Sequence, residues 1–153
     1  MDASVLIHLD RIDEVTLLRE LVGPIHVTNE VAQEVMCGPE PIDLRSPKFR
    51  SWVTILPPTE RVTRLGLGKG EGSVLLMARP GDRLVLDDAQ ARAVAEARGL
   101  EYVGLLGLLL AATSARTLSK HRALEVLDRL VATEFRLAPE LYANARKAIE
   151  KAR

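Results

Sequence analysis

Short apolar segments alternate with helical segments along this chain, and this order limits the possible fold more than any other feature. Each strand candidate is followed, directly or after a loop, by residues with the apolar spacing of a helix. The candidates are PIHV (24–27), WVTIL (52–56), RLVL (83–86) and EYV (101–103). Parallel strands need crossover connections, which helices supply. The sequence therefore predicts an α/β fold, with a parallel sheet between two layers of helices.

The whole chain, residues 1–153, has the length of one ordinary domain with a single hydrophobic core. Two short amphipathic helices are expected at ASVLIHL (3–9) and VTLLREL (15–21), and two more at about 120–133 and 139–151. The most apolar run, VGLLGLLLAA (103–112), is much shorter than the roughly 20 residues of a membrane-spanning helix. We interpret it as a buried helix.

Charge and cysteine content limit the partners and the cellular compartment that we expect for this protein. The 21 basic and 21 acidic residues cancel, so any site for a polyanion must be a local one. Cys37 is the single cysteine and cannot form an internal disulfide. The first residues carry acids where a secretory signal would carry basic side chains. We expect a cytoplasmic protein without a membrane segment.

Acidic side chains stand at the junctions where the expected sheet would bind a ligand. Asp87 and Asp88 follow the strand RLVL, Glu71 opens a helix, Asp2 precedes the first helix, and Glu34 lies on the helix after PIHV. Ligands of open parallel sheets bind beyond the carboxyl ends of the strands. Carboxylates that converge there repel one another unless they share a cation, and hard oxygen ligands suit Mg²⁺ or Mn²⁺. No zinc-binding motif is present.

Each acid also has an ordinary explanation. Asp2, Glu71 or Asp88 could cap the helix that it precedes or opens, and Glu34 could lie on a solvated helix face. The glycine-rich GLGKGEG is not a phosphate-binding loop, because Lys69 is followed by glycine and no apolar strand precedes it. Its glycines are expected to let a loop turn into the helix headed by Glu71.

Several motifs taken together resemble PIN-domain proteins over nearly the whole chain. They are DASVLIHL, TNEVAQEV, LGKGEGSVLLMA, LVLDDAQARAVAEARGL, GLLGLLLAA and FRLAPELY. More narrowly, the chain resembles the toxin-like (VapC-like) subfamily of bacteria and archaea. The resemblance implies a ribonuclease dependent on Mg²⁺ or Mn²⁺, with an acidic cluster at the carboxyl edge of its sheet. It also implies a homodimer with an antitoxin protein as partner.

The same resemblance assigns roles to individual residues. The acids expected to be catalytic and to bind the metal are Asp2, Glu34, Glu71 and Asp88. Ser4 would support the first of these acids, and Asp87 would support the metal site or cap the helix. In the family a full strand precedes the first aspartate, whereas here only Met1 does. The first strand is therefore expected to be truncated.

The substrate implied is RNA, single-stranded or in structured loops, hydrolysed to 5′-phosphate and 3′-hydroxyl ends by a metal-activated water. Basic residues that could contact RNA are Arg45, Lys48, Arg50, Lys69 and Arg92. They could equally form an ordinary solvated surface. A second interpretation stays open, in which a catalytically weak or silent module binds a protein partner or RNA without cutting it.

Overall fold

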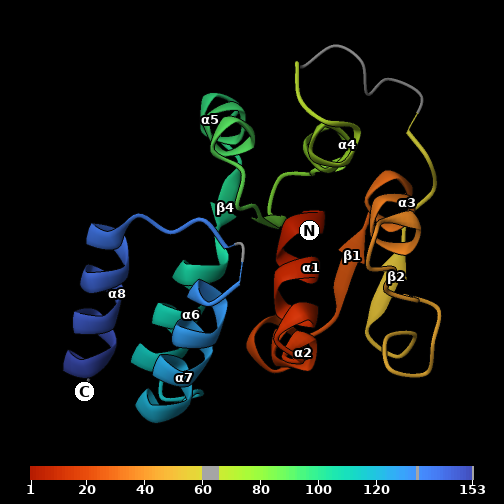
Figure 1. Cartoon of the computed structure of the whole chain (residues 1–153). Helices are drawn as coiled ribbons and strands as arrows, with labels where there is room; N and C mark the ends of the chain where they lie inside the picture. The colour runs from red at the N-terminus through yellow and green to blue at the C-terminus, as the bar shows by residue number, and fades with distance from the viewer. Residues whose placement is uncertain (60–65, 134, 153) are drawn as a thin grey trace.

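A computed structural model describes residues 1–59, 66–133 and 135–152 of the chain (Figure 1). Its elements are α1 (Ala3–Arg11), α2 (Val15–Val22), β1 (Ile25–Val27), α3 (Asn29–Cys37), β2 (Val53–Ile55), α4 (Lys69–Met77), β3 (Arg83–Val85), α5 (Ala89–Ala97), β4 (Glu101–Val103), α6 (Leu105–Ser114), α7 (Lys120–Val131) and α8 (Pro139–Lys151). All four expected strands form, and the α/β class is confirmed.

The strands form two separate parallel pairs, β1 with β2 and β3 with β4. The backbone of the first two residues lies between them, as Figure 1 shows at the start of α1. The Met1 amino group donates to the His26 carbonyl of β1 at 3.2 Å, and the Asp2 N–H donates to the Val85 carbonyl of β3 at 3.0 Å. The first residues thus link both pairs.

The prediction of one continuous central sheet is not met within the described residues. Met1 makes one hydrogen bond to β1, and Asp2 makes one to β3. Two hydrogen bonds are too few to form a strand between β1 and β3. The described strands therefore form two halves, which the backbone of Met1 and Asp2 links. Helices pack around both halves, and α6, α7 and α8 gather on one side of the molecule (Figure 1).

The glycines around Glu71 play two parts, of which the sequence predicted one. Gly66, with φ of 68°, and Gly68, the N-cap, lie where the loop turns into α4, whereas Gly70 and Gly72 lie inside the helix, which begins at Lys69. A Cβ on Gly70 would lie 2.6 Å from Oε2 of Glu34 and 3.4 Å from the Val31 side chain of α3. Gly70 therefore allows α3 and α4 to approach closely, which brings their acids together.

The apolar run after β4 forms a helix with a mainly buried face, as predicted. In α6 the side chains of Leu105 and Leu109 are fully buried, and they join a core that includes Leu6, Leu86 and Leu127. No helix within the described ranges combines the length and the apolar character needed to cross a membrane.

A buried carboxylate fastens the turn between α1 and α2 to α7. Glu14 is only 8% exposed and accepts hydrogen bonds from Arg122 at 2.6 and 2.7 Å and from Arg129 at 2.7 Å. Arg129 also donates to the carbonyl of Ile12. Because α1 begins directly after Asp2, this cluster of charges helps to fix the helix that follows the first acid.

We predict that Glu14→Gln lowers the free energy of unfolding by about 1–3 kcal/mol, because it removes charge-assisted hydrogen bonds to two guanidinium groups. Urea denaturation of the purified protein measures this. Glu20→Gln, at an exposed position of α2, is the matched control and should change the value by less than about 0.5 kcal/mol. Equal effects of the two substitutions would contradict the structural role of Glu14.

Candidate functional site

Asp2 is held at the point where the two strand pairs meet. Asp2 is 2% exposed, and its backbone N–H donates a hydrogen bond to the carbonyl of Val85, the last residue of β3. Its side chain makes no cap hydrogen bond to α1, so capping does not explain this acid. Instead its Oδ2 accepts a hydrogen bond from the Ser4 hydroxyl at 2.8 Å. Asp2 is a buried carboxylate with a hydroxyl donor, at the carboxyl edge of a strand.

Glu34 and Glu71 reach the same region from α3 and α4. Burial raises the pKa of the Glu34 carboxyl above its ordinary value, and the negative charges of Glu71 and Asp2 raise it further. The two helices are tied together by a buried hydrogen bond of 2.6 Å between the hydroxyls of Thr28 and Ser73. Three carboxylates from three elements therefore lie close enough to repel one another.

Asp87 and Asp88 face in different directions although they are neighbours in sequence. Asp88 is exposed and caps α5, because its Oδ1 accepts from the N–H of Ala91 at 2.7 Å. The side chain of Asp87 is 11% exposed, and its Oδ1 accepts from the N–H of Leu105 at 3.1 Å and from Arg92 at 3.3 Å. Asp88 thus caps α5, whereas Asp87 is bound to the start of α6. The sequence predicts Asp88 as the metal ligand, and that assignment stays a prediction.

The electrostatics of Asp87 show that it belongs to the acidic group. Burial raises the pKa of its carboxyl above the ordinary value, despite the opposing effects of the Leu105 N–H and the Arg92 charge, and Asp2 raises it further. Its Oδ2 is buried and has no hydrogen-bond partner among the described residues. A buried carboxylate oxygen without a donor is costly unless a cation or water meets it.

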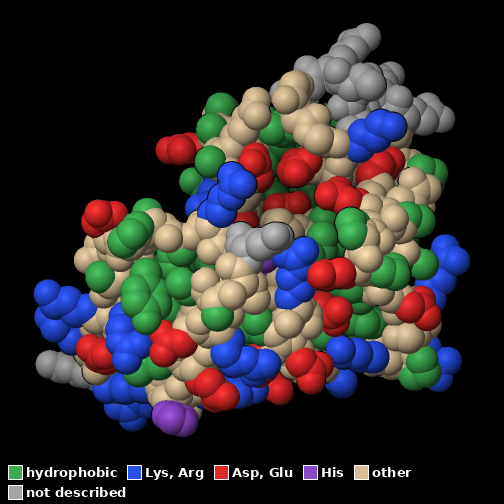
Figure 2. Space-filling model, viewed as in Figure 1, with side chains coloured by type: hydrophobic (Ala, Val, Ile, Leu, Met, Phe, Trp, Pro, Cys, Tyr) green, Lys and Arg blue, Asp and Glu red, His purple; other side chains and the backbone are tan. Residues whose placement is uncertain are grey.

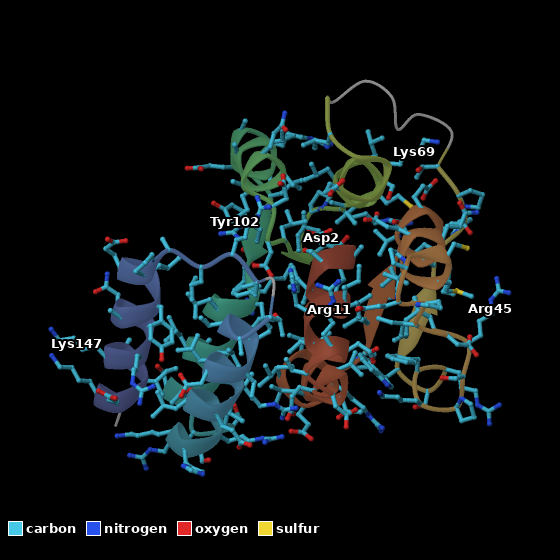
Figure 3. The ribbon with its side chains drawn as sticks, in the orientation of Figure 1. Asp2, Arg11, Arg45, Lys69, Tyr102 and Lys147 are labelled. Carbon is cyan, nitrogen blue, oxygen red and sulfur yellow. The ribbon has the colours of Figure 1, made fainter. Side chains whose placement is uncertain are left out.

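Figure 2 shows acidic side chains gathered in a hollow where α3, α4 and α5 surround the start of α1. In Figure 3, Asp2 lies at this point, beneath α4. We name the group the acidic centre, and its residues are Asp2, Glu34, Glu71 and Asp87.

The donor chemistry of the acidic centre fits a hard divalent cation. Its ligands would be carboxylate oxygens, and the partnerless Oδ2 of Asp87 is one that a cation would satisfy. Within the described residues, no three acidic, histidine or cysteine side chains stand close enough to hold one ion as they lie. Binding would therefore have to draw the repelling carboxylates of the acidic centre together.

The five basic residues considered for RNA do not form one surface. Arg92 bonds to both the carbonyl and the carboxylate of Asp87, and Lys69 is the first residue of α4, two positions before Glu71. The other three, Arg45, Lys48 and Arg50, belong to the segment before β2. Figure 3 shows Arg45 at the edge of the molecule, away from Asp2. Of the five, Arg92 contacts the acidic centre, through Asp87.

We predict that Glu34→Gln stabilises the protein at neutral pH in chelator-treated buffer. The raised pKa of Glu34 means that its charge costs more in the folded chain than in the unfolded one. This penalty is absent below the ordinary pKa of 4.5 and grows as pH rises through the folded value. The advantage of the variant should therefore vanish at pH 4 and below.

Thermal unfolding measured across pH, for the parent and for both Glu34→Gln and the exposed control Glu96→Gln, tests this. Added Mg²⁺ should raise the midpoint of the parent more than that of Glu34→Gln, because a bound cation relieves the repulsion. A midpoint for Glu34→Gln that follows the parent at every pH would refute the electrostatic account.

Comparison with known proteins supplies the family. A family model described as a PIN domain matches residues 1–151. No curated protein and no solved structure matches the chain. The match covers both strand pairs and all four residues of the acidic centre. The chain therefore belongs to the PIN-domain family.

Proposed function

We propose that this protein is a metal-dependent ribonuclease whose active site is the acidic centre, within a single PIN-like domain formed by residues 1–153. PIN domains are typically nucleases, their substrate is in general RNA, and they generally use divalent metal ions. Mg²⁺ or Mn²⁺ is the cofactor that carboxylate ligands favour.

The observation that carries the proposal is the position of Asp87. Its buried and partnerless Oδ2 lies in a group of acids that includes Asp2, and Leu105 and Arg92 hold its other oxygen. Such an arrangement leaves one carboxylate oxygen for a ligand outside the chain. A structural acid would have its hydrogen bonds satisfied.

The chemistry of phosphodiester hydrolysis explains why acids would be gathered here. The reaction needs a water that loses its proton and a positive charge against the phosphate as negative charge builds on it. Divalent ions bound by Asp2, Glu34, Glu71 and Asp87 would supply both. Ser4 would orient Asp2 through the hydroxyl hydrogen bond, and Arg92 would keep Asp87 in place.

This proposal exchanges the roles first given to the aspartate pair. Asp87 is proposed as the ligand, because its Oδ2 is buried without a partner and its carboxyl feels the negative charge of Asp2, and Asp88 is proposed as the cap that begins α5. Substitution by asparagine can test both assignments, since asparagine at either position keeps the size of the side chain and removes its charge.

The wider setting is proposed from the toxin-like resemblance. The protein would be the toxin of a toxin–antitoxin pair in the cytoplasm, would form a homodimer, and would be held inactive by an antitoxin protein. A catalytically silent module that binds RNA or a protein is the second candidate. It is favoured by the divided sheet, because Asp2 is anchored by single hydrogen bonds where a strand would hold it more firmly.

We predict that the purified protein cuts end-labelled single-stranded RNA with Mg²⁺ or Mn²⁺, leaving 5′-phosphate and 3′-hydroxyl ends, and that EDTA abolishes cleavage. Asp2→Asn and Asp87→Asn should each lower kcat by about 100-fold or more, because each removes a charge from the metal site. Asp88→Asn should stay near the parent rate, because asparagine caps helices well.

Asp43→Asn, in an exposed segment remote from the acidic centre, is the control for the substitution itself. Loss of cleavage in Asp88→Asn but not in Asp87→Asn would reverse the assignment of the pair. Cleavage that survives EDTA, or products with 2′,3′-cyclic phosphates, would refute the metal-water mechanism. A folded parent that cuts no RNA would favour the silent module.

A further inference from the structure

A cavity beside α1 has no part in the proposed chemistry. Its volume is about 460 Å³, within the range of small-ligand sites. The cavity is lined by His8, Thr133, Phe135 and Arg136, so it lies between α1 and the segment that follows α7.

The aromatic walls of the cavity are held in place by defined contacts. The rings of His8 and Phe135 stand nearly perpendicular, with 5.1 Å between their centroids and 80° between their planes. The Thr133 hydroxyl donates to the Leu130 carbonyl at 2.7 Å and accepts from the Phe135 N–H at 3.3 Å. The end of α7 therefore sets the position of the Phe135 ring, which packs partly against the core.

The cavity lies close to the acids along one face of α1. Ser4, which donates to Asp2, and His8 are four residues apart, so they share a helix face and are separated by about 6 Å along the axis. The charge of His8 is among those that lower the pKa of Asp87, which places the imidazole within electrostatic reach of that carboxyl. The rise of about 6 Å from Ser4 to His8 along α1 is of the order of the length of one nucleotide in an extended strand.

We propose that this cavity binds one nucleotide of the substrate RNA, next to the phosphate that is cut, with the base against Phe135 and a phosphate on Arg136. The inference rests on the proposed ribonuclease function and adds the recognition site to it. Single-stranded RNA is commonly recognised by stacking of its unpaired bases on aromatic rings, and arginine is suited to bidentate phosphate contacts. The acidic centre repels phosphate in the absence of metal, so a neighbouring site of this kind would hold the strand.

The test measures binding separately from cutting. Fluorescence anisotropy of a labelled single-stranded RNA, with Ca²⁺ in place of Mg²⁺, would compare the parent with Phe135→Leu and Arg136→Gln. Leucine keeps much of the volume of Phe135 but removes the flat ring, so the core contact is preserved. Lys147→Gln is the matched control, because Lys147 is exposed on α8 at the far edge of the molecule (Figure 3).

Phe135→Leu and Arg136→Gln are each expected to weaken RNA binding by about tenfold, and Lys147→Gln to leave it unchanged. An oligonucleotide series with one abasic position moved along the strand should show one position at which the parent binds as weakly as Phe135→Leu. At that position, Phe135→Leu and the parent should bind equally, because the base that distinguishes them is missing.

The outcomes separate this inference from the ribonuclease proposal. Weaker binding in both variants, from a parent that cuts no RNA, would uphold the nucleotide site and refute the nuclease. Metal-dependent cutting with parental affinity in both variants would uphold the nuclease and overturn the nucleotide site. Equal losses in Lys147→Gln and Arg136→Gln would also overturn it, since they would indicate a general effect of charge.

Discussion

The backbone of Met1 and Asp2 is the connection on which the rest of the structure depends. Its two hydrogen bonds, to His26 and to Val85, join strand pairs that have no strand between them in the part of the chain described. The same backbone fixes the first buried acid and begins the helix that reaches His8 and the cavity. Weakening this link would separate Glu34, on the helix that follows β1, from Asp87, which follows β3, because these elements belong to different halves of the sheet.

The approach of α3 to α4 brings like charges together, so it has a cost that packing must offset. Gly70 eases the contact, since a Cβ there would displace the end of the Glu34 side chain, and the buried hydroxyl pair of Thr28 and Ser73 stabilises it. Burial and, to a smaller extent, the negative charges of Glu71 and Asp2 raise the pKa of Glu34, so its charge has a cost in the folded chain. Strain of this kind concentrates at functional sites, because a chain selected for stability alone would separate the charges.

The sequence was sufficient for the local elements. Apolar spacing placed β3 within one residue of its observed end, and it placed α7 and α8 within two residues. Three of the acids that it singled out, Asp2, Glu34 and Glu71, lie close enough for their charges to interact. It was not sufficient to show which of Asp87 and Asp88 contacts the start of α6. That choice depends on the N–H of Leu105, which is 18 residues further along the chain. The cavity was missed for the same reason, because His8 and Phe135 meet only through tertiary packing.

The N-terminus of helix α6 lowers the electrostatic cost of gathering the acids before any cation binds. Its N-cap is Gly104, which has no side chain to offer, and the carboxylate of Asp87 takes that place by accepting the N–H of Leu105. A Cβ on Gly104 would lie 2.7 Å from Oδ1 of Asp87, so glycine is required for the contact. The positive end of the helix dipole then opposes the negative charge of the acidic centre. Because this contact uses only one carboxylate oxygen, Asp87 can stabilise the apolar helix and still present the other oxygen to a ligand.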